Sequence, residues 1–200
     1  MSTASVRWAS VPAVVSAVAS IVFFGAIFGF FFAWVCSTLW GLDTIDPRAA
    51  IEAMNGMNES VRNPVFFTAF FVTPLVAALA AALSAVHGAR GPAILLAAAA
   101  LLYGLGSILF TRTFNLPLNY GLAAGGVPAT LDEAARVWGE YSGQWQVYNL
   151  IRTVVSGVAL TLSACALFLL GRHTGRVENL GGTTMPTMRT AVTLGRAASE

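Results

Sequence analysis

The chain alternates between long apolar stretches and shorter polar segments. Its uncharged, apolar stretches run over residues 14–39, 64–86, 92–110 and 153–170. A helix needs roughly 20 predominantly apolar residues to cross the hydrocarbon core of a bilayer, and each stretch is about that long. The pattern therefore predicts four transmembrane helices. The first stretch is too long to be the core of a cleavable signal peptide.

The connections between these predicted helices differ in length. Only the link 87–91 is short, which predicts an antiparallel hairpin of the second and third spans. The other two links are long and fall on the same side of the membrane. We therefore expect an all-α, integral-membrane four-helix bundle over residues 1–177, with helical extensions on one face. Residues 178–200 lack a sustained apolar period, which is typical of a flexible C-terminal tail.

The long links contain signals for further helices. Asp46 followed by Pro47 is a typical helix start, with a capping side chain and a proline in the first turn. Asn63 and Pro64 end that helix and begin the second span. The segment 130–133 reads Thr-Leu-Asp-Glu and matches a capping box, so we expect a last helix to start there and to continue into the fourth span.

The composition excludes several classes of protein. Hydrophobic residues make up 56% of the chain and charged residues only 10%, against about a quarter charged in soluble domains. The net charge of +2 is too small for nucleic-acid binding. Cys36, Cys165, His87 and His173 have no partner at metal-ligand spacing, so no metal site is expected. No glycine-rich phosphate loop follows a strand, and we expect no flavin, nicotinamide or other cofactor.

The arginines give a weak indication of orientation. Six lie on the side of the two termini and five on the side of the long links, where most acidic residues also lie. Arg62, Arg112 and Arg152 of this second group border predicted spans closely enough to serve a site. The remaining bias favours an orientation with both termini in the cytoplasm, and we expect the protein to lie in the cell membrane.

Polar and aromatic residues recur at helical spacing in three places. The stripes are Ile51, Asn55, Asn58 and Arg62; Arg112, Asn115 and Asn119; and Trp138, Ser142, Trp145, Asn149, Arg152 and Ser156. Pro117 should kink the second of these helices. An amide and a charge facing lipid at the start of a span are costly, so Asn149 and Arg152 should face the interior. The alternatives are a solvated interfacial helix for the first stripe and an interfacial aromatic belt for Trp138.

Because the long links share one side of the membrane, these side chains can converge at one end of the bundle. Amides and guanidinium groups in a dry pocket can stabilise an oxyanion or enolate, and aromatic side chains can stack on a flat apolar substrate. Glu52, Glu59 and Glu140 are the candidate bases.

The same residues carry a family resemblance. Thr111-x-x-x-Asn115-Leu116-Pro117-Leu118-Asn119, Trp138-x-x-Tyr141 and Trp145-x-x-x-Asn149-x-x-Arg152-Thr153 resemble the pattern of the anthrone-oxygenase-like family of small four-span membrane proteins. Met57-Asn58-x-x-Val61-x-Asn63-Pro64-x-Phe66 is similar to that family's upstream motif. The matching motifs are spread over about residues 54–170, in the family's order.

The resemblance implies oxygenation of a hydrophobic polycyclic phenol, anthrone to anthraquinone, by dioxygen without an organic cofactor. We expect Asn115, Asn119, Asn149 and Arg152 to be catalytic. We expect the substrate-binding residues to be Asn58, Arg62, Arg112, Trp138 and Trp145. Many family members have His directly after the Asn of the last motif, where this chain has Leu150. If that His is the base or a metal ligand, this protein either uses another group or lacks the activity.

The competing hypothesis is a non-catalytic membrane protein. Such a protein would bind a lipid or a quinone, or serve as an accessory subunit of a larger complex, and the sequence is also compatible with a homo-oligomer. An enclosed pocket lined by Asn115, Asn149 and Arg152 and open to lipid would favour the enzyme. A solid bundle in which these groups satisfy one another would favour the structural role.

Overall fold

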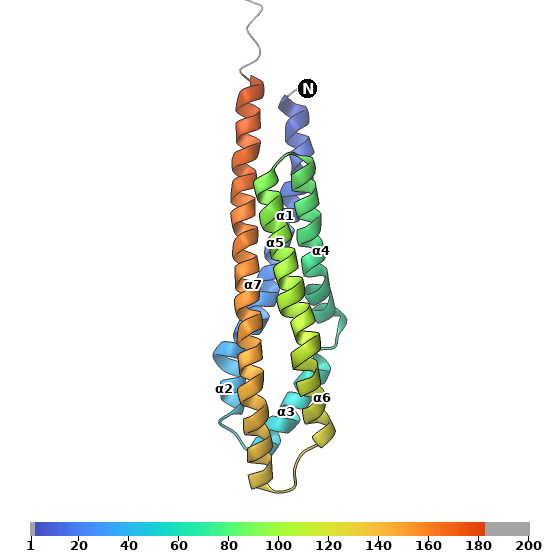
Figure 1. The fold of residues 1–200 in the computed structure, drawn as a ribbon, viewed down its shortest axis with the longest axis vertical. Helices are drawn as coiled ribbons and strands as arrows, with labels where there is room; N and C mark the ends of the chain where they lie inside the picture. The colour runs from blue at the N-terminus through green and yellow to red at the C-terminus, as the bar shows by residue number, and fades with distance from the viewer. Residues whose placement is uncertain (1–2, 183–200) are drawn as a thin grey trace, which may run out of the picture.

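The structure, a computed structural model, describes residues 3–182, and places the side chains of residues 11–176. Four long helices lie side by side in Figure 1: α1 (Thr3–Ala33), α4 (Pro64–Val86), α5 (Arg90–Tyr103) and α7 (Leu131–Gly182). The shorter helices α2 (Leu39–Leu42), α3 (Pro47–Ser60) and α6 (Leu116–Gly125) gather at one end. Within the described range there is no strand, so the predicted all-α fold is confirmed.

Three π-helical segments continue the long helices. Trp34–Thr38 follows α1, and Gly104–Leu109 and Thr111–Asn115 join α5 to α6. The described chain thus has four helical stretches that are long and apolar enough to cross a membrane, Val11–Leu42, Pro64–Val86, Arg90–Gly125 and Leu131–Arg176. Apart from Pro64–Val86, these stretches extend beyond the predicted spans, because the helices continue into the polar links.

The predicted helix starts are confirmed by their capping contacts. Asp46 accepts a hydrogen bond from the Arg48 backbone at 2.8 Å, and the Arg48 guanidinium that also binds it lowers the pKa of the Asp46 carboxyl to about 2. Asn63 accepts from the Phe66 backbone at 3.0 Å. At the start of α7, Thr130 accepts from the Glu133 backbone at 3.4 Å. These caps satisfy N–H groups that have no partner within their helices.

The predicted hairpin joins α4 to α5 at a tight turn. Gly88 adopts a left-handed backbone conformation with φ of 74°, which glycine reaches without a steric penalty. His173 of α7 lies with its Nε2 atom 3.3 Å from the His87 carbonyl oxygen, so α7 is tied to this turn. We call this the hairpin end of the bundle, and the end that holds α2, α3 and α6 the loop end.

The bundle core changes in character along its length. Near the hairpin end it is built largely from alanines such as Ala17, Ala80 and Ala166. The middle contains Phe24, Phe31 and Tyr103, whereas the loop end contains Trp138, Tyr141 and Trp145 with aliphatic residues. Small residues permit close helix approach in membranes, and the larger rings bring polar atoms into the loop end.

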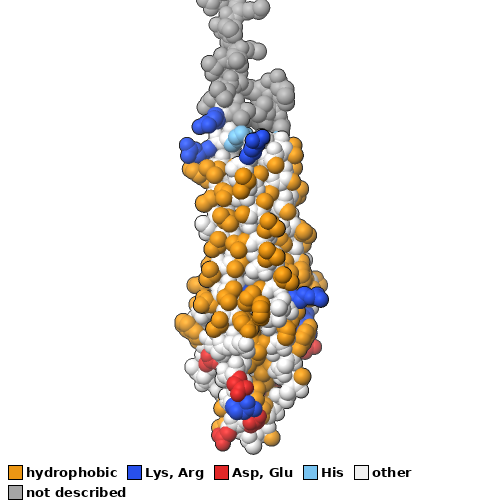
Figure 2. All heavy atoms as spheres, viewed as in Figure 1, with side chains coloured by type: hydrophobic (Ala, Val, Ile, Leu, Met, Phe, Trp, Pro, Cys, Tyr) orange, Lys and Arg blue, Asp and Glu red, His pale blue; other side chains and the backbone are white. Residues whose placement is uncertain are grey.

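The surface has the distribution expected of a membrane-spanning bundle. Figure 2 shows hydrophobic side chains over the middle, arginines and a histidine gathered at the hairpin end, and acidic side chains at the loop end. The helix α7 continues to Gly182, so residues 178–182, which we expected in a flexible tail, are helical. The rest of that predicted tail, residues 183–200, lies outside the described residues.

Candidate functional site

The polar stripe of α7 enters the bundle interior. Asn149 is 1% exposed and Arg152 is 6% exposed, as expected from the cost of placing an amide and a charge against lipid. Both lie well inside the stretch Leu131–Arg176 that can cross a membrane. The candidate site is therefore built around a buried guanidinium.

Arg152 is held by amide, hydroxyl and aromatic groups. Its Nη2 atom donates to Asn149 Oδ1 at 2.9 Å, and its Nη1 atom donates to Thr111 Oγ1 at 3.3 Å. Its Cζ atom lies 4.5 Å from the centroid of the Phe31 ring and 5.4 Å from that of the Trp145 ring. Among the described residues no carboxylate pairs with Arg152. A buried charge without a counterion is costly, and the aromatic faces offset only part of that cost.

Both the nitrogen and the oxygen of the Asn149 amide form hydrogen bonds. Its oxygen accepts from Arg152, and its nitrogen donates to the Phe31 carbonyl of α1 at 3.0 Å. The hydrogen bond to α1 sets the orientation of the amide, so its oxygen is held toward the guanidinium. Asn149 thus positions Arg152 as well as contributing to the polar surface of the site.

Several buried polar atoms of the predicted site residues have no hydrogen-bond partner in the described protein. They are both amide atoms of Asn115, the indole nitrogen of Trp145 and Nε of Arg152. Asn115 is 1% and Trp145 5% exposed. Leaving a buried donor or acceptor unsatisfied costs about 1–3 kcal/mol, and such groups in native structures call for an explanation. One explanation is that these donors and acceptors are available to bind a ligand.

The structure corrects the predicted stripe Arg112, Asn115, Asn119. Asn115 is buried, whereas Arg112 is exposed, and Thr111 takes the position that contacts Arg152. The reason is the π-helical segment Thr111–Asn115. A π-turn contains more residues than an α-turn, so α-helical spacing no longer places Arg112 and Asn115 on one face.

A second polar cluster joins three helices at the loop end. Tyr141 of α7 donates to Asn119 Oδ1 at 2.9 Å. Asn119 of α6 donates to Asn58 Oδ1 at 2.9 Å, and Asn58 of α3 donates to Tyr141 Oη at 3.4 Å. The three side chains form a closed triangle, the Asn58–Asn119–Tyr141 triangle, in which each donates once and accepts once. This geometry stabilises the packing of α3 and α6 on α7.

A third cluster surrounds Asp43, just after α2. Its Oδ1 atom accepts from Trp138 Nε1 at 2.9 Å and from Ser142 Oγ at 2.6 Å. Its Oδ2 atom accepts from Gln146 Nε2 at 2.9 Å. Trp138 is buried in the aromatic core rather than lying in a surface belt. The cluster anchors the end of the first span to α7.

The other predicted residues lie farther out. Arg62 follows the end of α3 and is exposed, and its Cζ atom stacks 5.2 Å from the centroid of the Tyr120 ring. The candidate bases Glu52, Glu59 and Glu140 are all exposed, and Glu140 accepts a hydrogen bond from Arg136 at 2.8 Å. Since none of these carboxylates is buried, none shares the interior environment of Arg152.

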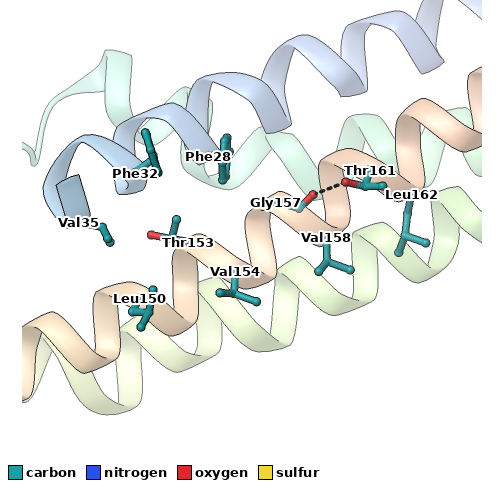
Figure 3. Close-up of a pocket in the computed structure, with 10 residues that line it drawn as sticks. All are labelled: Phe28, Phe32, Val35, Leu150, Thr153, Val154, Gly157, Val158, Thr161 and Leu162. Atoms are coloured by element: carbon teal, nitrogen blue, oxygen red, sulfur yellow. Dashed lines mark hydrogen bonds between the residues drawn. The ribbon is translucent and has the colours of Figure 1, made fainter.

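Two neighbouring grooves connect the apolar outer surface with this region. One, of about 230 Å³, lies between the end of the first span and α7, and is lined by Trp34, Val35, Trp40, Trp145, Gln146, Val147, Asn149 and Leu150. The second, of about 440 Å³, shares Val35 and Leu150 with it and runs along α1 and α7 (Figure 3). Asn149 and Trp145 are thus reached laterally. Asn115 and Arg152 are buried and line neither groove.

Sequence reasoning missed several contributors to the site. Thr111 and Tyr141 belong to the recognised motifs, and their positions there could have marked them. Phe31 contributes a carbonyl and a ring from a uniformly apolar span, and Asp43 lies about a hundred residues from its partners. Nothing local in the sequence distinguishes these last two.

These features define a multi-pass membrane protein in which four apolar helical stretches enclose amides, aromatic rings and one buried guanidinium. The family model described as anthrone oxygenase matches residues 64–162. This range holds α4, α5, α6 and the part of α7 with Asn149 and Arg152. The chain belongs to this anthrone-oxygenase-like family. No curated protein and no solved structure matches it.

Proposed function

We propose that the protein is a membrane-embedded oxygenase that converts a hydrophobic polycyclic phenol of the anthrone type to a quinone with dioxygen. The observation that carries the proposal is the buried guanidinium of Arg152, which is surrounded by amides and aromatic rings and has no carboxylate partner in the described chain. Such a group is available to stabilise an anion that develops on a bound substrate. Family membership supports the substrate class.

The chemistry requires an anion intermediate. Loss of one proton from the ring methylene gives a carbanion whose charge spreads onto the carbonyl oxygen. This anion transfers an electron to dioxygen, and recombination of the two radicals followed by protonation gives a hydroperoxide. Loss of water then leaves a carbonyl where the methylene was, so one oxygen atom enters the product and the other leaves as water. Stabilising the first anion lowers the barrier to the whole sequence.

Arg152 and the amides supply that stabilisation. In a desolvated site, donors already aimed at the developing charge are worth a few kcal/mol each. Asn149 holds Arg152, and the unpartnered Asn115 amide and Trp145 indole offer further donors. We assign the acidification of the substrate to this environment, with the proton leaving to solvent, since the candidate glutamates are exposed.

The grooves give the substrate a lateral route from the bilayer. Trp34, Trp40 and Trp145 line the smaller groove, and indole rings suit a flat aromatic substrate. In this proposal Asn119 and Asn58 maintain the site through the Asn58–Asn119–Tyr141 triangle, and Trp138 does so through Asp43. Arg62 and Arg112 help to bind the substrate at the loop end. The protein acts in the cell membrane with both termini in the cytoplasm, alone or as a homo-oligomer.

The alternative is a non-catalytic quinone or lipid binder, in which the polar residues hold helices together. The Asn58–Asn119–Tyr141 triangle and the Asp43 cluster favour a structural role for their own members, because their polar groups satisfy one another. Asn149 and Arg152 also bind one another, and the two grooves reach Asn149 but neither Asn115 nor Arg152, which counts toward the structural role. The atoms of Asn115, Trp145 and Arg152 that have no partner in the described protein support the enzyme.

The proposal is tested with purified protein in detergent, an anthrone and dioxygen, by following quinone formation. We expect a rate above spontaneous oxidation that falls roughly 100-fold or more in Arg152→Gln, as for the loss of an oxyanion donor. Arg136→Gln is the matched control, because it removes an exposed arginine from the same helix, and it should retain the wild-type rate. No rate above background would exclude this function, and equal rates in both variants would exclude the role of Arg152. Metal analysis of the same sample tests the expectation that no metal is needed.

A further inference from the structure

The hairpin end of the bundle, opposite the candidate site, carries a basic groove. A cavity of about 660 Å³ opens between the α4–α5 turn and α7. It is lined by Ala89, Arg90, Gly91, Pro92, Leu169, Arg172, His173, Gly175 and Arg176. The three arginines are exposed, and Figure 2 shows the basic side chains gathered at this end. Among residues 11–176, no carboxylate lines the groove, so the electrostatic potential of the described lining favours an anion.

The backbone adds to this positive potential. The helix α5 begins at Arg90, and its N-cap residue, Ala89, provides no side-chain hydrogen bond. Among its first three residues, Arg90 donates its N–H to the Gly88 carbonyl at 3.0 Å and Pro92 has no N–H, so the Gly91 N–H and the partial positive charge of the helix start remain to attract an anion. The arginines and this helix start therefore face the same cavity.

The groove is also fixed in shape. One wall belongs to the hairpin and the other to α7, and the contact between His173 Nε2 and the His87 carbonyl, at 3.3 Å, joins them. Arg172 lies with its Cζ atom 5.8 Å from the centroid of the Phe168 ring. The guanidinium groups thus line a preformed cleft.

Apolar side chains continue the groove toward the middle of the bundle. Phe168 is 65% and Leu169 is 38% exposed on α7, and Ile94 is 67% exposed on α5. The basic groove therefore lies where the apolar belt meets the polar end. An amphipathic anion, with a charged head and apolar chains, would use both surfaces, whereas a free anion would use only the charge.

We propose that the basic groove binds the phosphate of an anionic phospholipid, with the acyl chains along Phe168, Leu169 and Ile94. Guanidinium groups bind phosphate through paired hydrogen bonds, and basic residues at the membrane surface attract anionic lipid. This inference is independent of the proposed oxygenase function. The hairpin-end arginines would then bind a ligand as well as favour one orientation of the protein in the membrane.

Native mass spectrometry of the purified full chain, titrated with equal amounts of phosphatidylglycerol and phosphatidylcholine, tests this inference. We expect retained phosphatidylglycerol to exceed phosphatidylcholine by roughly tenfold or more. The Arg90→Gln, Arg172→Gln, Arg176→Gln triple variant should lose about 100-fold in affinity for phosphatidylglycerol, since each arginine near the surface contributes about fivefold. A charge-matched variant with Arg48→Gln, Arg112→Gln and Arg136→Gln should retain it.

Further arms identify the source of the phosphate and guard against misfolding. Millimolar inorganic phosphate should leave the lipid bound, and displacement would show a free-anion site and overturn the proposal. Equal retention of the two lipids, or wild-type affinity in the groove variant, would also overturn it. The corresponding Arg→Lys triple variant keeps the charge and should keep most of the preference. If the Gln variant does not fold, Arg172→Gln alone should lower affinity about fivefold, and an unchanged affinity would count against the groove.

Discussion

Two regions of α7 place an arginine in opposite environments, one exposed and one buried. Near the start of the helix, Arg136 is exposed and pairs with Glu133 at 2.6 Å and Glu140 at 2.8 Å. Farther along, where the helix lies inside the bundle, Arg152 is buried, and the described groups that hold it are amide, hydroxyl and aromatic. The first arrangement follows from neighbouring side chains on one helix face. The second requires contributions from α1 and from the π-helical segment before α6.

The difference between these regions indicates where function resides. An exposed ion pair contributes little to stability and costs little to form. A buried guanidinium without a counterion is expensive in a membrane, and such groups mark functional sites by default. In the proposed function, the counterion is the anion that develops on a substrate bound beside Asn149.

The asparagines of the α5–α6 region provide a matched pair that sharpens this comparison. Asn115 is buried without a partner for either amide atom. We expect Asn115→Leu to lower the rate of anthrone oxidation by about 10- to 100-fold, since it removes a donor from the site. Its thermal stability in detergent should be unchanged or higher, because an unsatisfied buried amide is replaced by an apolar group of similar size. A wild-type rate in this variant would remove Asn115 from the site.

Asn119, one turn away, should respond in the opposite way. Its amide donates to Asn58 and accepts from Tyr141, so Asn119→Leu leaves Asn58 Oδ1 without its donor and the Tyr141 hydroxyl without its acceptor. We expect the free energy of unfolding to fall by about 2 kcal/mol, measured by denaturant titration in detergent. A stability equal to wild type would show that the Asn58–Asn119–Tyr141 triangle does not hold the loop end together.

The smallest effect is expected at Arg136. Arg136→Gln removes two exposed ion pairs, which should leave the free energy of unfolding close to that of the wild type. Raising the salt concentration should reduce even this difference, since salt screens exposed charges. A loss larger than that of Asn119→Leu in the same titration would contradict the contrast between the two regions.

The parts of the fold predicted from sequence are those that local patterns determine. The apolar stretches predicted the membrane helices, and Asp46, Asn63 and Thr130 marked the helix starts through contacts within three residues. The burial of Asn149 and Arg152 followed from the cost of exposing them to lipid.

The remaining features depend on packing or on irregular backbone. The face predicted for Arg112 and Asn115 was wrong because the intervening helix has π-helical hydrogen bonding. The contribution of Phe31 through its carbonyl and ring could not be predicted, since it depends on how α1 packs against α7. The triangle likewise requires three helices to meet.

The central claim is that Arg152 stabilises the substrate anion, and the pKa of a bound anthrone measures this directly. The titration is followed by absorbance without oxygen, so that no turnover occurs. We predict that binding to the wild-type protein lowers the apparent pKa of the anthrone by about one to three pH units, as for an acid beside a fixed opposite charge. Arg152→Gln should abolish this shift, whereas Arg136→Gln should retain it. Equal titration curves for the wild-type protein and Arg152→Gln, with substrate bound to both, would contradict the claim.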